Sequence, residues 1–164
     1  MHSYFAAAMR DPLDKIQQDH FLIARNPVVK EMLSTAGGMA AVLNEHRQVL
    51  HLNQRLMKRL GIQGPNTGLG LRPGEILECV HAREEPGGCG TSKSCKDCGA
   101  VIAILSCQAK NKSVEQDCVI FTETDGEAGL LHLHVRVVPI NLHARQFLLV
   151  FLEDKSAAPH PRAL

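Results

Sequence analysis

The sequence predicts an α+β domain with a five-stranded antiparallel sheet, helices on one face, an N-terminal helix and a cysteine-rich insert. Three observations lead to this fold class. Apolar and polar residues alternate along "LLHLHVRV" (130–137), the period of two that is typical of a half-buried strand. Two short apolar runs, 39–43 and 49–52, flank a polar turn and indicate a β-hairpin. Helical segments separate this hairpin from three closing strands, an order that favours antiparallel strands with segregated helices.

The N-terminal helix is predicted over 11–25, where apolar residues recur at helical spacing. Leu13, Ile16, His20 and Ile23 form a heptad-like stripe with intervals of three and four residues. Two interpretations of the stripe stay open. It can pack against the chain's own domain, or Leu13, Ile16 and Ile23 can form a dimer contact.

The other elements follow from local sequence signals. A second helix begins at Asn26-Pro27 and is closed by two glycines, and a short helix follows the hairpin at 53–61. A well-buried helix is expected in "CGAVIAILSCQAK", which is apolar on most sides. The last strand, "RQFLLVFLED", is apolar on both faces and is therefore predicted to be central or covered on both sides.

Composition bounds the class of protein. A chain of 164 residues can bury roughly 70% of its unfolded surface, so it needs no metal merely to fold. With 18 basic and 17 acidic residues, the charge balance argues against nucleic acid or an anionic membrane as the partner. No apolar run is long enough to span a bilayer, and the N-terminus lacks a secretory signal, so we expect a cytoplasmic protein with reduced thiols.

The middle of the chain resembles a known family. The stretch "VLNEHRQVLHLNQRLMKRLG" (42–61) resembles the opening of a PAS domain, and "LRPGEIL" (71–77) resembles the segment that follows in many of them. The resemblance covers about residues 26–153, although a glycine often occupies the first hairpin turn and here the turn is "NEHRQ". It implies a five-stranded antiparallel sheet whose concave face holds a cofactor or ligand or is simply packed. It also implies a signalling role, often through dimers.

The resemblance gives an expected division of the chain. Residues 1–25 are a helical extension, residues 26–154 form the PAS-like sensory domain with its insert at 79–98, and residues 155–164 are a disordered tail.

Candidate metal ligands lie in the insert. Cys79, Cys89, Cys95 and Cys98 are spaced by nine, five and two intervening residues, so only the last pair forms a CxxC. A CxxC turn can direct both thiolates at one metal ion. His81 is an alternative to Cys79 as the fourth ligand. Four neighbouring glycines suit tight turns beside bound sulfur atoms, some of which require positive φ: Gly87, Gly88, Gly90 and Gly99.

The identity of the metal stays open between zinc and an iron–sulfur cluster. Zinc takes four ligands in a tetrahedron, whereas a cluster takes four cysteines at less regular spacings. The insert resembles that of a subset of bacterial PAS domains with a "GCG…CxxCG" pattern, and a cluster suits a sensory fold. A metal-free alternative makes Cys95 and Cys98 a dithiol switch or plain reduced thiols.

The insert also needs something to order it. From Ala82 to Cys98 the chain offers almost no apolar side chain to bury, and long structureless loops are uncommon unless functional or disordered. Structural zinc contributes on the order of 10 kcal/mol in small peptides, enough to offset the chain entropy of several residues. We therefore expect a bound metal to order the insert.

The remaining cysteines and polar motifs are weaker signals. Cys107 is expected to fill the core; Cys118 is too, although it could be a spare ligand or resolving thiol. His132 and His134 fit the solvated face of a strand. The sequence contains no GxGxxG, Walker lysine, GxSxG or HExxH motif, so we do not expect an enzyme.

The leading hypothesis is a cytoplasmic PAS-type sensory domain with a cysteine-ligated metal centre for redox or metal sensing. We expect a homodimer that acts on a signalling partner such as a histidine kinase or regulator. Two alternatives are a protein-interaction module with structural zinc and a small-molecule-binding PAS domain.

Overall fold

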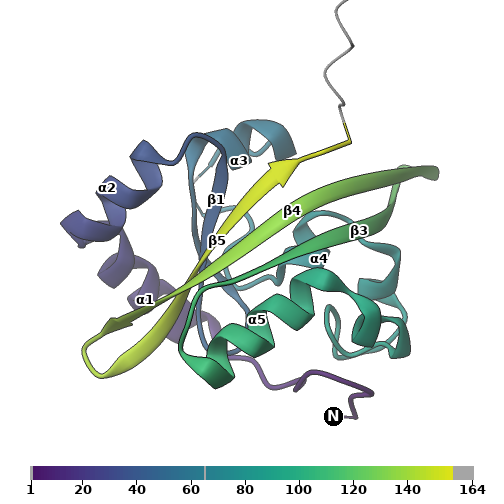
Figure 1. Cartoon of the computed structure of the whole chain (residues 1–164), viewed down its shortest axis with the longest axis horizontal. Helices are drawn as coiled ribbons and strands as arrows, with labels where there is room; N and C mark the ends of the chain where they lie inside the picture. Colours follow the sequence, from purple (N-terminus) through teal and green to yellow (C-terminus); the bar gives the residue numbers. More distant parts are fainter. Residues whose placement is uncertain (1, 65, 157–164) are drawn as a thin grey trace, which may run out of the picture.

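The computed structural model describes residues 2–64 and 66–156, so most of the predicted tail lies outside the described residues. Its elements follow the predicted order (Figure 1). The helices are α1 (Leu13–Arg25), α2 (Pro27–Thr35), α3 (Gln54–Leu60), α4 (Pro73–Ile76) and α5 (Gly99–Lys110), with the 3-10 helices η1 (Val80–Arg83) and η2 (Lys93–Asp97). The strands are β1 (Met39–Leu43), β2 (Val49–Leu52), β3 (Val114–Thr124), β4 (Glu127–Leu142) and β5 (Arg145–Asp154).

These strands form one five-stranded antiparallel sheet in the order β2-β1-β5-β4-β3. The predicted α+β fold class is confirmed. β5 is central, as its doubly apolar sequence predicted, because Phe147 and Leu149 pack on one face while Leu148 and Val150 pack on the other. Each of these four side chains is at most 3% exposed.

The concave face carries the larger core. Apolar side chains from β1, β3, β4 and β5 pack there against α3 and α5, and α4 lies at the edge of the same cluster. Ala103, Ile104 and Cys107 of α5 are buried in it, and Cys107 is 0% exposed. The expected core position of Cys107 is therefore what the structure has.

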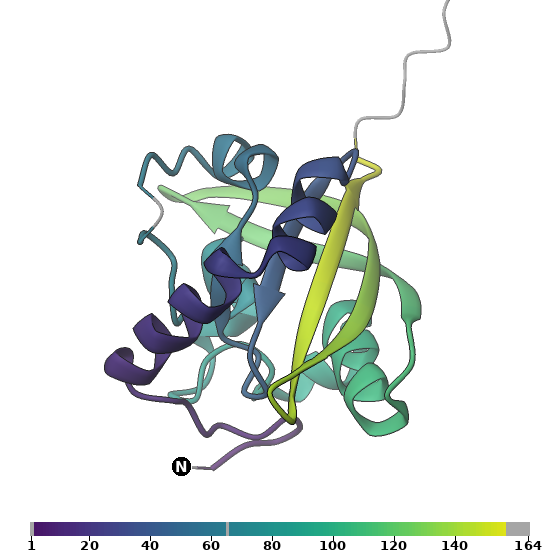
Figure 2. The same ribbon diagram turned by 90° about the vertical axis from the view of Figure 1, so that its left-hand side faces the viewer.

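The opposite face is covered by α1 and α2, which pack over β2, β1 and β5, with α1 against β2 (Figure 2). Helices therefore cover both faces of the sheet, the N-terminal pair on one and the later helices on the other. Ile16 and Ile23 are each 1% exposed in this second cluster, whereas Leu13 is 64% exposed. Packing within the chain accounts for Ile16 and Ile23. The dimer interpretation of the stripe stays a prediction, and in this arrangement Leu13 is the exposed member of the three that a partner could reach.

The turn between β1 and β2 has no glycine, and Arg47 takes the left-handed conformation that a glycine often adopts in such a turn. Arg47 adopts a φ of 65°, in the left-handed region that favours glycine. Asn44 stabilises the turn, since its side-chain oxygen accepts hydrogen bonds from the backbone N–H groups of His46 and Gln48, both at 2.9 Å. This conformation directs the Arg47 side chain toward the insert.

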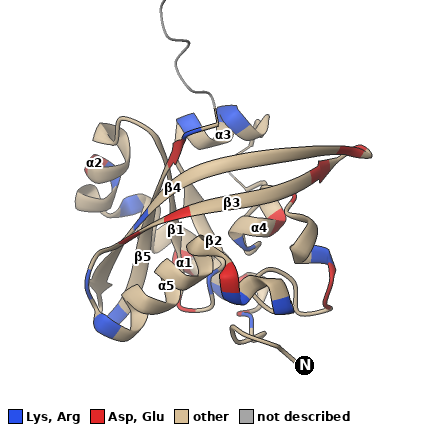
Figure 3. Cartoon of the chain, turned by 45° about the vertical axis from the view of Figure 1, so that its right-hand side comes forward, with Lys and Arg blue, Asp and Glu red and all other residues tan. Residues whose placement is uncertain are grey.

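Charged positions are interspersed around the described part of the fold (Figure 3), in keeping with a formal net charge of +1. None of the helices within residues 2–64 and 66–156 is both long and apolar enough to cross a membrane.

Candidate metal centre

Four cysteines line one cavity between the insert and the concave face of the sheet. Its volume is about 260 Å³, and its apolar wall comes from α5 and the closing strands. The chain supplies the sulfur atoms from separate places: Cys79 precedes η1, Cys89 lies in the glycine-rich loop, Cys95 lies in η2, and Cys98 precedes α5. We call this space the cysteine cavity. All four predicted ligand cysteines therefore face the same space.

Local structure fixes each of these positions. Cys79 pairs with Thr122 in an isolated β-bridge and donates its backbone N–H to the Gly74 carbonyl at 2.8 Å. The side chain of Ser92 caps η2, which places Cys95 one turn before Cys98, and the Cys98 N–H donates to the Cys95 carbonyl at 3.1 Å. The CxxC thus forms a turn, as its spacing predicted.

Backbone N–H groups lie near all four sulfur atoms and favour their thiolate forms. Those of His81 and Ala82 act to lower the pKa of Cys79, and that of Gly74 acts to lower the pKa of Cys89. The N–H groups of Ser92 and Gly90 act in the same direction on Cys95, and those of Ala100 and Val101, in the first turn of α5, do so on Cys98. Hydrogen bonds of this kind stabilise thiolates and tune thiolate-ligated metal groups.

The thiols differ in acidity. Burial raises the pKa of Cys89 to about 12, and burial also raises the pKa of Cys79 and of Cys95. A hydrogen bond from Cys118 lowers the pKa of Cys98 to about 6, and the same contact raises the pKa of Cys118. Cys98 is therefore the thiol that ionises most readily.

The spacing of the sulfur atoms bears on which group would fit. No three of the cysteine sulfurs, all of them in the described part of the chain, lie within 4.8 Å of one another. Four thiolates on one tetrahedral zinc would be about 3.8 Å apart. An iron–sulfur cluster places iron and sulfide between its thiolates and so separates them further. The described sulfur positions are therefore wider than tetrahedral zinc requires, which favours a cluster over zinc as the group to test.

Two further predicted candidates lie beside the cavity. His81 lines it, but its Nδ1 contacts the Glu84 carboxylate. Cys118 is 2% exposed in β3, and its Sγ lies 3.7 Å from the Cys98 Sγ. Cys118 therefore fills the core as expected and also faces a predicted ligand.

The loop before η2 is held by buried arginines that sequence analysis did not single out. Arg72, at the start of α4, is 0% exposed. Its guanidinium donates to the carbonyls of His46 (2.9 Å), Gly87 (3.0 Å), Ala7 (3.2 Å) and Met9 (2.7 Å). Burial lowers the pKa of Arg72 to about 10, so it stays charged at neutral pH. One side chain thus joins the N-terminus, the first hairpin and the insert.

Arg47 and Arg10 complete what we call the arginine network. Arg47 lines the cysteine cavity and donates to the carbonyls of Ala7 (3.0 Å) and Cys89 (3.1 Å). Its Nε is buried without a hydrogen-bond partner among the described residues. Arg10 forms a two-pronged ion pair with Glu75.

The charges of this network do not cancel. Glu75 is the carboxylate that contacts it in the described chain, and it also accepts from the N–H groups of Arg72 and Cys89, both at 3.0 Å. Arg10 pairs with Glu75, whereas the guanidinium groups of Arg47 and Arg72 donate to backbone carbonyls and have no carboxylate partner among the described residues. Buried charge of one sign is costly unless it is paired, so Arg47, which lines the cavity, favours an anionic occupant.

The N-terminal residues add backbone bonds to the same loop. The N–H groups of Tyr4 and Ala6 donate to the carbonyls of Thr91 (3.0 Å) and Gly90 (2.9 Å). The expectation that a bound metal orders residues 82–98 therefore leaves out these polar contacts. Polar contacts hold the part up to Thr91, and apart from the Arg72–Glu75 spacing no local sequence signal indicates them.

The glycines of the insert serve two different purposes. Gly88 and Gly90 have φ values of 82° and 91°, as expected for tight turns beside sulfur. Gly99 has no positive φ; instead, a Cβ there would lie 1.9 Å from the Asp117 carbonyl oxygen. Its role is close contact between α5 and β3.

Comparison with solved structures identifies the fold. The PAS domain of nitrogen regulation protein NR(II) from Vibrio parahaemolyticus matches with a TM-score of 0.52 and 15% identity, over 79% of this chain and 99% of that chain. This chain has the PAS fold. RsLOV matches with a TM-score of 0.53 and 9% identity, over 88% of this chain and 72% of that one.

A third match has a similar score. An RNA-binding light-oxygen-voltage receptor matches with a TM-score of 0.51 and 13% identity, over 78% of this chain and 32% of that one. No protein-family model matches the sequence, and no curated protein does. At these identities the likeness establishes the fold alone, and the resemblance to a cysteine-rich PAS subset stays a prediction.

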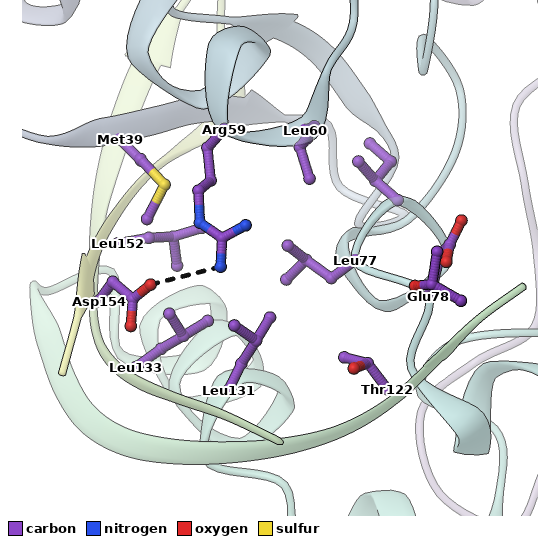
Figure 4. Close-up of a pocket in the computed structure, with 12 residues that line it drawn as sticks. Met39, Arg59, Leu60, Leu77, Glu78, Thr122, Leu131, Leu133, Leu152 and Asp154 are labelled. Atoms are coloured by element: carbon purple, nitrogen blue, oxygen red, sulfur yellow. Dashed lines mark ion pairs between the residues drawn. The ribbon is translucent and has the colours of Figure 1, made fainter. Parts of the chain in front are cut away.

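A second cavity opens on the same concave face of the PAS fold (Figure 4). Its volume is about 280 Å³, and its lining combines leucines from α3, β4 and β5 with charged and hydroxyl side chains such as Glu78 and Thr122. Arg59 and Asp154 form an ion pair of 3.5 Å across one side. This cavity is the place where the small-molecule alternative would put a ligand.

Proposed function

We propose that this chain is a PAS-type sensory domain whose cysteine cavity holds a thiolate-ligated metal centre, with an iron–sulfur cluster as the better-fitting group. The observation that carries the proposal is the shared cavity of Cys79, Cys89, Cys95 and Cys98. When bound, such a group would supply redox or oxygen sensitivity. The proposal is for a sensor that signals through a protein partner and not for an enzyme.

The surroundings of the cavity support an anionic occupant. Backbone N–H groups face the four sulfur atoms, and Arg47 places a buried guanidinium at the wall. A metal bound by four thiolates carries net negative charge in its zinc form and in the common oxidised cluster forms. Arg47 would offset part of that charge.

A route from the centre to the sheet supports signalling. Cys98 precedes α5, and α5 packs on β3 and β4 through Gly99 and its buried apolar residues. A change in ligation at Cys98 would therefore move the start of α5 against the sheet. We propose that a signalling protein, such as a histidine kinase or regulator, reads this movement, with the chain acting as a homodimer.

The decisive experiment is anaerobic purification followed by iron, zinc and acid-labile sulfide analysis and a visible spectrum. We expect iron and sulfide in comparable amounts. Cys95→Ser and Cys98→Ser should each lower the bound metal sharply because each removes one thiolate, while the matched control Cys107→Ser should not. Zinc without sulfide would exclude the cluster and favour the alternative, a protein-interaction module with structural zinc. Equal metal content in all three variants would overturn the assignment of the metal site.

Metal removal gives a second readout. Amide exchange should accelerate around η2 and at the start of α5, where ligation would hold Cys95 and Cys98. Exchange should change less at Gly90 and Thr91, which the arginine network and the N-terminal bonds hold without metal. Cooperative unfolding of the whole domain on chelation would contradict a sensory centre and indicate a structural one.

The cavity of Figure 4 supports one alternative, a PAS domain that binds a small molecule. Its leucine lining and the Arg59–Asp154 pair suit a ligand with an apolar body and a polar group. A ligand that co-purifies with metal-free protein would favour it.

A further inference from the structure

Cys98 and Cys118 form a close pair that metal ligation does not require. Their Sγ atoms lie 3.7 Å apart, the one sulfur–sulfur contact that the structure records within its described residues. Cys98 precedes α5 and Cys118 lies in β3, twenty residues later in the chain. Cys118 is 2% exposed, whereas Cys98 is half-buried and lines the cysteine cavity.

The fold is built so that these two residues meet. Gly99 lies directly against β3, because a Cβ on Gly99 would be 1.9 Å from the Asp117 carbonyl oxygen and 3.3 Å from the Cys118 Cα. Any side chain at position 99 would push the start of α5 away from the strand. The glycine therefore keeps the sulfur of Cys98 beside that of Cys118.

The CxxC is the less suitable pair for a disulfide. Cys95 lies in η2 and faces the cavity with its own backbone hydrogen bonds, and no sulfur contact with Cys98 is recorded between these described residues. A disulfide needs its sulfurs about 2.05 Å apart. For Cys98 and Cys118, an approach of about 1.7 Å between the sulfurs meets this requirement.

We propose that Cys98 and Cys118, and not the CxxC pair, form the disulfide of this domain when a peroxide reaches the cavity in the absence of metal. The Cys98 thiolate attacks a peroxide oxygen, the O–O bond breaks, and the departing oxygen leaves as water, which gives a sulfenic acid. The Cys118 sulfur then attacks the Cys98 sulfur, the S–O bond breaks, and a second water leaves with the Cys118 proton. Two thiols and one hydrogen peroxide thus yield one disulfide and two waters.

This bond removes Cys98 from the candidate ligand set and draws the start of α5 toward β3. The consequence for metal binding rests on the proposed function, but the disulfide itself does not. It gives Cys118 a role as the resolving thiol.

The test uses the full chain, reduced, metal-free and anaerobic, treated with one equivalent of hydrogen peroxide. Free thiols are alkylated, and the protein is digested without reductant for mass spectrometry. We expect the Cys98–Cys118 linkage as the dominant crosslink. A dominant Cys95–Cys98 linkage, or no linkage of Cys118 to any cysteine, would overturn the proposal.

Variants sharpen the result. In Cys118→Ala the crosslink should disappear and Cys98 should be trapped as a dimedone adduct of its sulfenic acid. Cys107→Ser, which alters a buried cysteine outside the pair, should retain the crosslink. If Cys118→Ala does not fold, the wild-type peptide map decides alone. If the purified protein contains metal but the oxidised protein lacks this disulfide, the proposed metal centre stands and the disulfide proposal fails. If the disulfide forms but no metal is found, the disulfide proposal stands and the proposed metal centre fails.

Discussion

On one face of the sheet, α1 and α2 bury Ile16, Ile23 and Val29, each 1% exposed. On the other, the insert approaches the core with glycines, polar residues and cysteines, and buried arginines hold it to the N-terminus and the first hairpin. The first covering is stabilised by apolar area and the second by hydrogen bonds to charged groups. The difference implies that the insert can change its contacts without loss of the fold.

The energetics of the two regions differ in kind. Burial of an aliphatic side chain contributes about 1.5–3 kcal/mol, and this contribution does not depend on the orientation of the neighbouring groups. A buried guanidinium stabilises only while its carbonyl partners remain in place, since each hydrogen bond to a charged group is worth about 1.5–3 kcal/mol. Loss of one partner in the insert therefore affects the others.

The largest loss of stability is expected from Arg72→Gln, which removes the guanidinium that joins the insert to the N-terminus and the first hairpin. It removes the Arg72 donor from the carbonyls of His46 and Met9 and one of two arginine donors from those of Ala7 and Gly87. We expect a loss of about 3–5 kcal/mol, as for a broken buried pair. Urea denaturation measures it, and hydrogen exchange should show faster opening of residues 4–10 and 87–91. The exposed Arg55→Gln is the matched control. Equal stability of the two variants would show that the network is dispensable.

The second effect tests the apolar face. Ile16→Ala should destabilise the domain by about 2–4 kcal/mol, because a fully buried side chain is removed from a packed core. Leu13→Ala should change stability by less than about 0.5 kcal/mol, because Leu13 is 64% exposed. Denaturation curves check both values. A reversal of this order would return the stripe to the dimer interpretation, and light scattering of the two variants would then show which one weakens association.

The contrast between the faces also explains what could be predicted. The fold followed from patterns that repeat along the chain: the alternation in β4, the doubly apolar β5 and the polar turn of the first hairpin. The grouping of the four cysteines followed from their types and from the CxxC turn. These signals come from residues close together in the chain, so they can be recognised in the sequence alone.

The arginine network has no such signal. Arg72 bonds to residues near 7, 46 and 87, and nothing in its own neighbourhood points to these partners. The stripe of α1 was ambiguous for a related reason, because a helical period does not tell whether the covering surface belongs to the same chain. The sequence around Gly99 predicts a turn residue, whereas the structure requires glycine there because α5 lies close to β3, a strand far from it in the sequence pattern.

The smallest effect concerns an ion pair that joins α1 to the sheet. Asp19 is 4% exposed, and both its oxygens accept from Arg145 at the start of β5, at 2.7 Å and 2.8 Å. The hydrogen bond from Arg145 holds the pKa of Asp19 below its ordinary value. The Arg145 side chain is 33% exposed, so solvent screens part of the interaction. We expect Asp19→Asn to cost about 1–2 kcal/mol at pH 7.

The pH dependence of that cost has a definite sign. A carboxyl whose pKa is lower in the folded state stabilises the fold fully above its unfolded pKa, about 3.9, and loses this contribution as the pH falls through the folded value. The stability difference between wild type and Asp19→Asn should therefore be constant from pH 7 to about 5 and shrink below about pH 4. Urea denaturation at pH 7, 5 and 3 measures it, with the exposed Glu31→Gln as control. A difference that persists undiminished at pH 3 would mean that Asp19 acts through packing and not through its charge, and the α1 face would then be stabilised by apolar contact alone.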